Sequence, residues 1–310
     1  MKIITLTLSP AFDIHSYGEE FIRDHENIAT VTARDAGGKG INISRALAVF
    51  GIENVAVAVL GEENGEDFAR AVRSDDIDLL PIFDKGRIRE NITVHTKNGK
   101  ETRLSFTSTP VSDGILNKVE EKIKKLITGD TVLTVTGRIP DGIKVSDVKV
   151  MIKRFSELGV KTVVDSRSFS LSDLIDIKPY LIKPNEEEIA VYMQRPVTDV
   201  KEATEAAKEL YAKGIENVMV SLGEKGAVLA SRDGIFHAVA PKILPVSTIG
   251  AGDSSIAGFL TGISIGENTE NALRRAVAFG TSACLTEGTR PPKTCDVENI
   301  IKEVTVNKID

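Results

Sequence analysis

The sequence predicts an α/β protein with a mostly parallel central sheet, helices on both faces of that sheet, and a small antiparallel sheet beside it. Three observations support this prediction. Apolar, strand-like runs alternate with amphipathic helical stretches over most of the chain, which is the pattern of a parallel sheet covered by helices. Two regions break this alternation and look antiparallel. A chain of 310 residues with 41% hydrophobic side chains can also bury a full core.

The elements follow from the alternation in chain order. The predicted strands are apolar, β-prone runs at residues 2–8, 54–61, 130–137, 160–166, 180–185 and 217–223. The predicted helices are amphipathic stretches at residues 41–51, 64–74, 144–159 and 200–214. A helix between two strands is the crossover that neighbouring parallel strands require.

The two interruptions lie at about residues 12–35 and 88–107. In the second, Asn98 and Gly99 separate two β-prone runs, and both residue types tolerate the positive φ of a tight hairpin turn. We expect the two inserts to form a small antiparallel sheet that projects as a lid from a single domain spanning residues 1–310. The alternative is an edge hairpin with no functional role.

The charge and the special residue types exclude several classes of function. Lys and Arg number 39 against 45 Asp and Glu, a net charge of −6, which offers no footprint for nucleic acid or an anionic membrane surface. No apolar run is long enough to span a membrane, and the first residues alternate like a strand, so a cytoplasmic protein is expected. Cys284 and Cys295 lack metal or redox spacing, and the four histidines are scattered.

The stretch "STIGAGDSSIAG", residues 247–258, places Asp253 where a glycine-rich turn enters an apolar helix. Backbone amides at Gly250, Ala251 and Gly252 would attract an anion such as phosphate. An ionised carboxylate is also stabilised at a helix N-terminus and can accept a proton. This pattern fits phosphoryl transfer in which the amides stabilise the charge and Asp253 takes the proton of the attacking hydroxyl. A structural Asp in the first helical turn is the alternative.

A second glycine cluster, "AGGKGINIS" at residues 36–44, also opens a helix. Its backbone can approach a ligand closely, and Lys39 and Asn42 offer polar groups to a sugar or a phosphate. Glycines before a helix are common in α/β loops, so this motif alone is weak evidence.

Two further motifs follow in the second half of the chain. "LIKPNEEE" leaves a strand and enters a helix through Asn185, and Glu188 stands three residues on, so a capping box explains this pair without any function. The functional alternative places Asn185 and Glu188 beside hydrated Mg²⁺, which accompanies nucleotide phosphates. "VSLGEKGA", residues 220–227, reads as a strand, a glycine turn and another strand, a usable floor for a nucleotide.

Taken together and in this order, the four motifs resemble those of the PfkB, or ribokinase-like, family of carbohydrate kinases, and the resemblance covers nearly the whole chain. It implies a ribokinase-like three-layer α/β/α fold with a β lid, and an ATP- and Mg²⁺-dependent kinase. Asp253 would be the catalytic base, and Gly250, Ala251 and Gly252 the anion hole. The acceptor sugar would contact Gly37, Gly38, Lys39 and Asn42. ATP would contact Lys183, Asn185, Ser221, Gly223 and Gly226, with Glu188 holding Mg²⁺ through water.

The start "TLTLSPAFD" is most similar to the hexose-phosphate branch of that family. The resemblance implies an acceptor that is a ketohexose phosphate: fructose 1-phosphate, tagatose 6-phosphate or fructose 6-phosphate. Asp13 would bind sugar hydroxyls and Arg89 the substrate's phosphate, since a guanidinium matches phosphate oxygens. Two residues depart from the branch: Ser9 stands where Asn is frequent, and Arg138 where a small Ser is usual. An extra arginine near the acceptor adds a phosphate contact or changes the preferred sugar.

Two other functions remain open on the sequence alone. One is a ribokinase- or nucleoside-like kinase with an unphosphorylated acceptor, although such an acceptor offers Arg89 and Arg138 no anion. The other is a catalytically silent sugar-phosphate sensor, against which Asp253 argues. The resemblance also leaves open a homodimer formed through the lid.

Overall fold

The computed structural model describes residues 1–99 and 101–309. The strands of the larger sheet are β1 (Lys2–Thr7), β4 (Asn54–Gly61), β5 (Asp78–Asp84), β8 (Thr131–Thr136), β9 (Lys161–Asp165), β10 (Leu181–Ile182), β11 (Val218–Ser221), β12 (Ala227–Ser231), β13 (Gly234–Val239) and β14 (Thr305–Ile309). The helices are α1 (Lys39–Val49), α2 (Gly65–Arg73), α3 (Ile115–Lys124), α4 (Val145–Glu157), α5 (Leu171–Ile177), α6 (Glu186–Met193), α7 (Val200–Ala212), α8 (Ala251–Ser264), α9 (Thr269–Ala283) and α10 (Thr294–Glu303).

The larger sheet is mostly parallel, as predicted. Its strand order is β14-β13-β12-β11-β10-β9-β8-β1-β4-β5. The pairs from β5 to β11 are parallel, and β12, β13 and β14 add an antiparallel edge. The carboxyl ends of β1, β8, β9 and β10 therefore lie next to one another, which is where α/β proteins place their sites.

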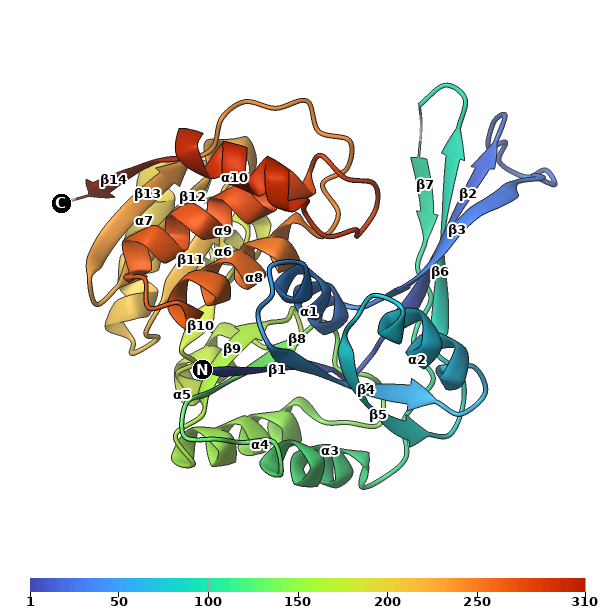
Figure 1. Ribbon diagram of the computed structural model, residues 1–310, viewed down its shortest axis with the longest axis horizontal. Coiled ribbons are helices and arrows are strands. Elements are labelled where there is room, and N and C mark those ends of the chain that lie inside the picture. The colour runs from blue at the N-terminus through green and yellow to red at the C-terminus, as the bar shows by residue number, and fades with distance from the viewer. Residues whose placement is uncertain (100, 310) are drawn as a thin grey trace.

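Helices cover both faces of this sheet (Figure 1). Successive strand residues point to opposite faces. Ile4 packs in a core with residues of α3 to α7, whereas Ile3 packs in a second core with residues of α1, α8, α9 and α10. This gives the three-layer α/β/α architecture that the motifs implied. None of the helices in the described part of the chain is both long and apolar enough to cross a membrane.

The two predicted inserts form a second sheet that projects from one side of the molecule (Figure 1). Its strands are β2 (Ala11–Gly18), β3 (Thr30–Gly37), β6 (Arg89–Thr96) and β7 (Glu101–Leu104), in the order β3-β2-β6-β7. Each insert is an antiparallel hairpin, and the two hairpins join through a parallel pairing of β2 with β6. We call this second sheet the lid sheet.

Two of the differences between the predicted and observed boundaries concern the site. The helix expected from residue 41 begins at Lys39, so Lys39 and Asn42 both lie in its first turn. The strand expected over 180–185 forms a continuous ladder only at Leu181–Ile182, because Pro184 has no N–H for a ladder, and pairing returns at a single bridge between Asn185 and Ser221. Lys183 therefore stands just beyond the carboxyl end of β10.

Candidate active site

A polar cleft of about 400 Å³ lies between the carboxyl ends of the central strands, the lid sheet and the N-termini of α1 and α8. Most of the predicted site residues line it: Asp13, Gly38, Lys39, Asn42, Arg89, Arg138, Lys183, Asn185, Glu188, Gly250, Gly252 and Asp253. Gly37 and Ala251 are chain neighbours of lining residues. Ser221, Gly223 and Gly226 do not line this cleft; their turn adjoins it through a bridge between Asn185 and Ser221.

Asp253 lies in the first turn of α8 and is buried. Its Oδ2 accepts a hydrogen bond of 2.9 Å from Nδ2 of Asn42. The pKa of Asp253 is raised to about 6, mainly by burial and also by the charge of Asp165, while Lys39, the Asn42 hydrogen bond and Lys183 act in the opposite direction. The carboxylate is thus ionised near pH 7 and has a pKa suited to accepting a proton.

Asp165 is a second buried carboxylate in the cleft, and the sequence analysis missed it. It ends β9, and its Oδ2 lies 2.8 Å from Nζ of Lys39. Burial alone would raise its pKa, but the charges of Lys183 and Lys39 hold the pKa of Asp165 below its usual value. The signal that could have found it was available, because an Asp at the carboxyl end of a parallel strand points to a site.

The N-terminus of α8 contributes backbone donors to the cleft. Gly250 precedes the helix with φ of 80°, a left-handed conformation that favours glycine. The first amides of a helix have no partner within it. The amide of Ala251 donates at 3.4 Å to the backbone oxygen of Thr248, and the amides of Gly250 and Gly252 can donate to an anion. A Cβ on Gly252 would lie 2.9 Å from Nζ of Lys183, so glycine at this position leaves room for the ammonium beside the turn.

The lid sheet contributes Asp13, whose neighbours the sequence analysis also missed. Oδ1 of Asp13 accepts hydrogen bonds from Nδ2 of Asn91 at 3.0 Å and from Nη2 of Arg103 at 2.8 Å. Asn91 of β6 pairs with Asp13 of β2 across the parallel ladder, and Arg103 of β7 lies opposite Thr93 of β6. Because the hairpin turn at Asn98-Gly99 sets this register, alternation along the two strands was the signal that could have placed Arg103 beside Asn91.

Three guanidinium groups line the cleft near one another: those of Arg89 and Arg103 from the lid sheet, and that of Arg138 from the segment after β8. Arg89 donates to the backbone oxygens of Phe106 at 3.1 Å and Ser9 at 3.5 Å, and its buried Nε has no partner. Burial lowers the pKa of Arg89, and repulsion from Arg138 and Arg103 adds to this, against the attraction of Asp13. Arg138 is exposed and forms no hydrogen bond or ion pair with any described residue. Such crowded positive charge favours an anionic ligand.

The pair Asn185 and Glu188 forms the predicted capping box at the start of α6. Oδ1 of Asn185 accepts from the Glu188 amide at 2.8 Å, and Oε2 of Glu188 accepts from the Asn185 amide at 3.1 Å. The other Glu188 oxygen, Oε1, accepts a 2.8 Å hydrogen bond from Nε of Arg167. The structural interpretation of this motif is therefore confirmed, and the carboxylate still lines the cleft.

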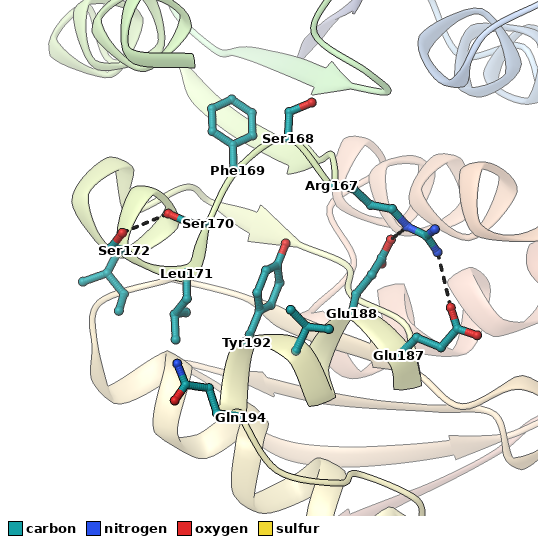
Figure 2. A pocket seen from close by; sticks show the side chains of 12 residues that line it. Arg167, Ser168, Phe169, Ser170, Leu171, Ser172, Glu187, Glu188, Tyr192 and Gln194 are labelled. Atoms are coloured by element: carbon teal, nitrogen blue, oxygen red, sulfur yellow. Dashed lines mark hydrogen bonds and ion pairs between the residues drawn. The ribbon is translucent and has the colours of Figure 1, made fainter. Parts of the chain in front are cut away.

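A larger hollow of about 810 Å³ lies on the other side of Glu188, between the segment 167–172 and α6. Figure 2 shows the Arg167 guanidinium between Glu188 and Glu187 at one side of it. This hollow has mostly apolar walls and shares only Glu188 with the set of predicted site residues. The smaller, polar cleft is therefore the better candidate for chemistry.

The turn between β11 and β12 has a conformation that requires glycine. Gly226 has φ of 85°, and a Cβ there would collide with the backbone oxygen of Ala238. The turn starts from Ser221, whose amide donates to the Pro184 oxygen at 3.0 Å. The strand–turn–strand arrangement is as predicted, and it places this turn next to Asn185.

Comparisons with known proteins agree with the geometry. Residues 11–295 match the model described as pfkB family carbohydrate kinase. The chain is 30% identical over 307 residues to 1-phosphofructokinase from Bacillus subtilis (strain 168), covering 99% of this chain and 100% of the relative. It is 28% identical over 310 residues to tagatose-6-phosphate kinase from Staphylococcus epidermidis, covering 99% and 100%.

Solved structures of phosphofructokinase-2 from Escherichia coli share the fold. The crystal structure in complex with substrates and products has a TM-score of 0.92 at 27% identity, covering 98% of this chain and 99% of that chain. The structure of its tetrameric inhibited form has a TM-score of 0.88 at 26% identity, covering 97% and 98%. The similarity thus extends over nearly the whole chain, lid sheet included.

Proposed function

The chain belongs to the pfkB family of carbohydrate kinases, as its four motifs predicted, and from that premise we propose that it phosphorylates a primary hydroxyl of a ketohexose phosphate with ATP. The candidates are fructose 1-phosphate, tagatose 6-phosphate and fructose 6-phosphate. The observation that carries the proposal is one cleft that joins a buried carboxylate, Asp253, to the three arginines of the lid side. The relatives that are hexose-phosphate kinases by name support the same substrate class.

In this proposal the arginines bind the phosphate that the sugar already carries. Arg89 and Arg138 have free donors for it, whereas Arg103 is engaged with Asp13. Asp13 would accept hydrogen bonds from sugar hydroxyls, and the backbone at Gly37 and Gly38 would approach the sugar. A guanidinium contact to phosphate is charge-assisted and stronger than a neutral hydrogen bond.

In the transfer of the phosphoryl group from ATP to the sugar, Asp253 acts as the base. The hydroxyl oxygen of the sugar attacks the γ-phosphorus of ATP, the bond from that phosphorus to the β–γ bridging oxygen breaks, and ADP leaves. Asp253 accepts the hydroxyl proton as the new P–O bond forms. The amides of the Gly250–Gly252 turn, with Lys39 and Lys183, would stabilise the charge on the transferred group.

ATP would lie along Lys183, Asn185 and the turn with Ser221, Gly223 and Gly226. Glu188 fits Mg²⁺ held through water, because Mg²⁺ prefers oxygen ligands, keeps several waters and uses few carboxylates when phosphates are present. Its partner in the structure is Arg167, an exposed side chain that also pairs with Glu187. When bound, Mg²⁺ neutralises charge on the β- and γ-phosphates.

We also propose that two copies of the chain associate through their lid sheets. Large apolar side chains are exposed on this sheet and its connections: Tyr17, Phe21, Ile22, Ile28, Val31, Leu104 and Phe106. Exposed apolar groups gathered on one small element are typical of an interaction surface. The existence of a tetrameric form of the E. coli relative shows that such a fold can assemble.

A coupled assay of ADP release over a panel of acceptors tests the proposal. We expect turnover with at least one of the three ketohexose phosphates and weak turnover with free fructose or ribose. A preference for a free sugar would overturn the substrate class and leave the kinase assignment intact. Binding of sugar phosphate and ATP without ADP release would instead identify a silent sensor.

A further inference from the structure

Arg45 is a buried arginine, one turn after Asn42 on α1, whose role the family motifs do not specify. It donates to three acceptors on three segments of the chain. Nη1 donates to Oδ1 of Asn42 at 3.3 Å, Nη2 to the backbone oxygen of Ala36 at 2.8 Å, and Nε to Oδ2 of Asp75 at 2.9 Å. The planar guanidinium is therefore held at its three nitrogens.

Arg45 is connected to Asp253 through the side chain of Asn42. Oδ1 of Asn42 accepts a hydrogen bond from Arg45, and Nδ2 of Asn42 donates one to Oδ2 of Asp253. A carboxamide has an accepting end and a donating end of similar shape, so its partners decide which end faces which way. An arginine can only donate and an ionised carboxylate can only accept, so Arg45 holds the Asn42 oxygen on its own side and keeps the nitrogen directed toward Asp253.

We propose that Arg45 is a positioning residue for Asp253: it orients the Asn42 amide so that one carboxylate oxygen is held while the other remains free for the substrate hydroxyl. The inference rests on the proposed function, in which Asp253 is the base. Arg45 does not line the cleft; it lines a second cavity of about 880 Å³ behind α1, so it acts without touching substrate.

Asp253 and Arg45 have different charged neighbours. The pKa of Asp253 is affected by the charges of Lys39 on α1, Asp165 on β9 and Lys183 after β10. The cavity that Arg45 lines also carries charged residues from β3, from the segment after α2 and from the segment after α9: Arg34, Asp35, Asp75, Asp76, Glu287, Arg290 and Lys293. Among the described residues, Asn42 is the side chain that hydrogen-bonds Asp253, so the connection passes through one amide.

The test is a ¹³C NMR titration of the Asp253 carboxyl in the protein without substrate, with Asp253→Asn used to assign the signal. A hydrogen bond to the charged form lowers a pKa, so losing the Asn42 contact should raise the pKa of Asp253 by about one unit. We expect this shift in Arg45→Met and also in Arg45→Lys. Lysine keeps the positive charge but, with one ammonium, does not hold three separated acceptors.

Two comparisons separate this effect from others. Arg70→Met removes an exposed ion pair with Asp67 on α2 and should leave the Asp253 titration unchanged. In an Asn42→Ala background, which already lacks the contact, Arg45→Lys should add no further shift. In the coupled assay, Arg45→Lys should move the acid limb of kcat to higher pH by the same amount, with KM for ATP unchanged.

The proposal fails if Arg45→Lys titrates like the wild type, even with a lower melting temperature, because Arg45 would then be only structural. It also fails if the shift persists in the Asn42→Ala background, since the effect would then be direct charge. If no acceptor is phosphorylated, the proposed function falls, and the titration still decides whether Arg45 positions the carboxylate. Arg45→Lys, the milder change, carries the test should Arg45→Met not fold.

Discussion

The buried carboxylate of Asp253 lowers the stability of the folded protein at the pH at which it can accept a proton. Burial raises its pKa to about 6, above its usual value, so ionisation is less favourable in the folded protein than in the unfolded chain. The stability associated with the protonated form is present at low pH and is lost as the pH rises through about 6. Near neutral pH the protein therefore holds a base at a cost in folding free energy.

Asp253→Asn should change both the turnover number and the free energy of unfolding. Without a proton acceptor, kcat should fall roughly 10²–10⁴-fold if general-base catalysis dominates. The neutral amide also removes the ionisation penalty, so the free energy of unfolding should rise by about 2–3 kcal/mol near pH 8 and change little near pH 4. Urea unfolding at the two pH values and the coupled assay measure these effects. Turnover within tenfold of wild type would remove Asp253 from the role of base.

In the proposed function, Arg89 and Arg138 bind the phosphate of the acceptor sugar. A charge-assisted contact to phosphate is worth about 1.5–3 kcal/mol, so Arg89→Ala and Arg138→Ala should each raise KM for the sugar phosphate roughly tenfold to a hundredfold. Arg89→Lys should raise it less, since it keeps the charge and loses the planar fork. KM for ATP should barely move in any of them. Steady-state kinetics with both substrates varied is the measurement, and equal changes in the two KM values would place these arginines elsewhere.

At the scale of elements, the start of α8 brings backbone donors, Lys183 and Asp253 together. The turn can bind an anion only if a ligand can approach its backbone. The absence of a side chain at Gly252 leaves space that the Lys183 ammonium occupies. The start of this helix thus serves two purposes: it brings backbone amides to the cleft, and it carries the proposed base, Asp253, in its first turn.

Gly252→Val should damage transfer more than binding of the sugar. A β-branched side chain would displace the Lys183 ammonium and obstruct the amides, so kcat should fall at least tenfold. Gly129→Val, at an exposed glycine with open space around it, is the matched control and should retain activity. Unchanged kinetics in Gly252→Val would mean that the turn does not meet phosphate.

The lid sheet is the element on which assembly depends in our proposal. Ile28 is 86% exposed and Val31 61% exposed, and a charge at both positions should prevent apolar contacts between two copies. Ile28→Asp with Val31→Asp should convert a dimer to a monomer in light scattering after size-exclusion chromatography. Leu158→Asp, at a side chain 57% exposed far from the lid sheet, should leave the mass unchanged. A wild-type chain that is already monomeric would contradict the proposed association.

At the scale of the whole molecule, the cleft joins the lid sheet to the central domain. Asp13, Arg89 and Arg103 come from the lid sheet, whereas Lys39, Asp165 and Asp253 come from the central layers. A ligand that touches both sets connects two parts of the protein that are separate sheets. Binding energy from the phosphate end should therefore also stabilise the arrangement in which the base faces the acceptor.

Addition of the preferred sugar phosphate should raise the melting temperature of the whole protein. At a concentration about a hundred times the Kd, linkage predicts about 2.7 kcal/mol of stabilisation. Arg138→Ala should show a smaller shift at the same ligand concentration, and free fructose should give almost none to either protein. A thermal unfolding series is the measurement, and an equal response to fructose and to its phosphates would argue against a phosphate-binding lid.

Much of the fold was determined by local patterns in the sequence. Alternating apolar strands and amphipathic helices predicted the three layers, because burial of one or both faces imposes a period on each element. Asn98-Gly99 predicted a hairpin, and β6 and β7 do pair antiparallel on either side of it. Gly99 has the expected positive φ, whereas Asn98 does not, so the hairpin is confirmed and the tight turn with two positive φ angles is not. The glycine-rich turns predicted the N-termini of α1 and α8, and in the structure both N-termini line one cleft. The capping box of Asn185 and Glu188 is also present, as one interpretation of that motif expected.

Other features were decided only by the tertiary structure. Asn42 and Asp253 form a hydrogen bond although they are 211 residues apart, and Lys39 pairs with Asp165 across 126 residues. Arg103 reaches Asp13 through the register of two paired hairpins, and Arg45 reaches Asp253 through the amide of another residue. Local periodicity carries no information on such pairs, because which side chains meet depends on strand order and helix packing. The sequence alone thus determined the elements and the kinds of groups they carry, and the packing of those elements decided which groups act on one another.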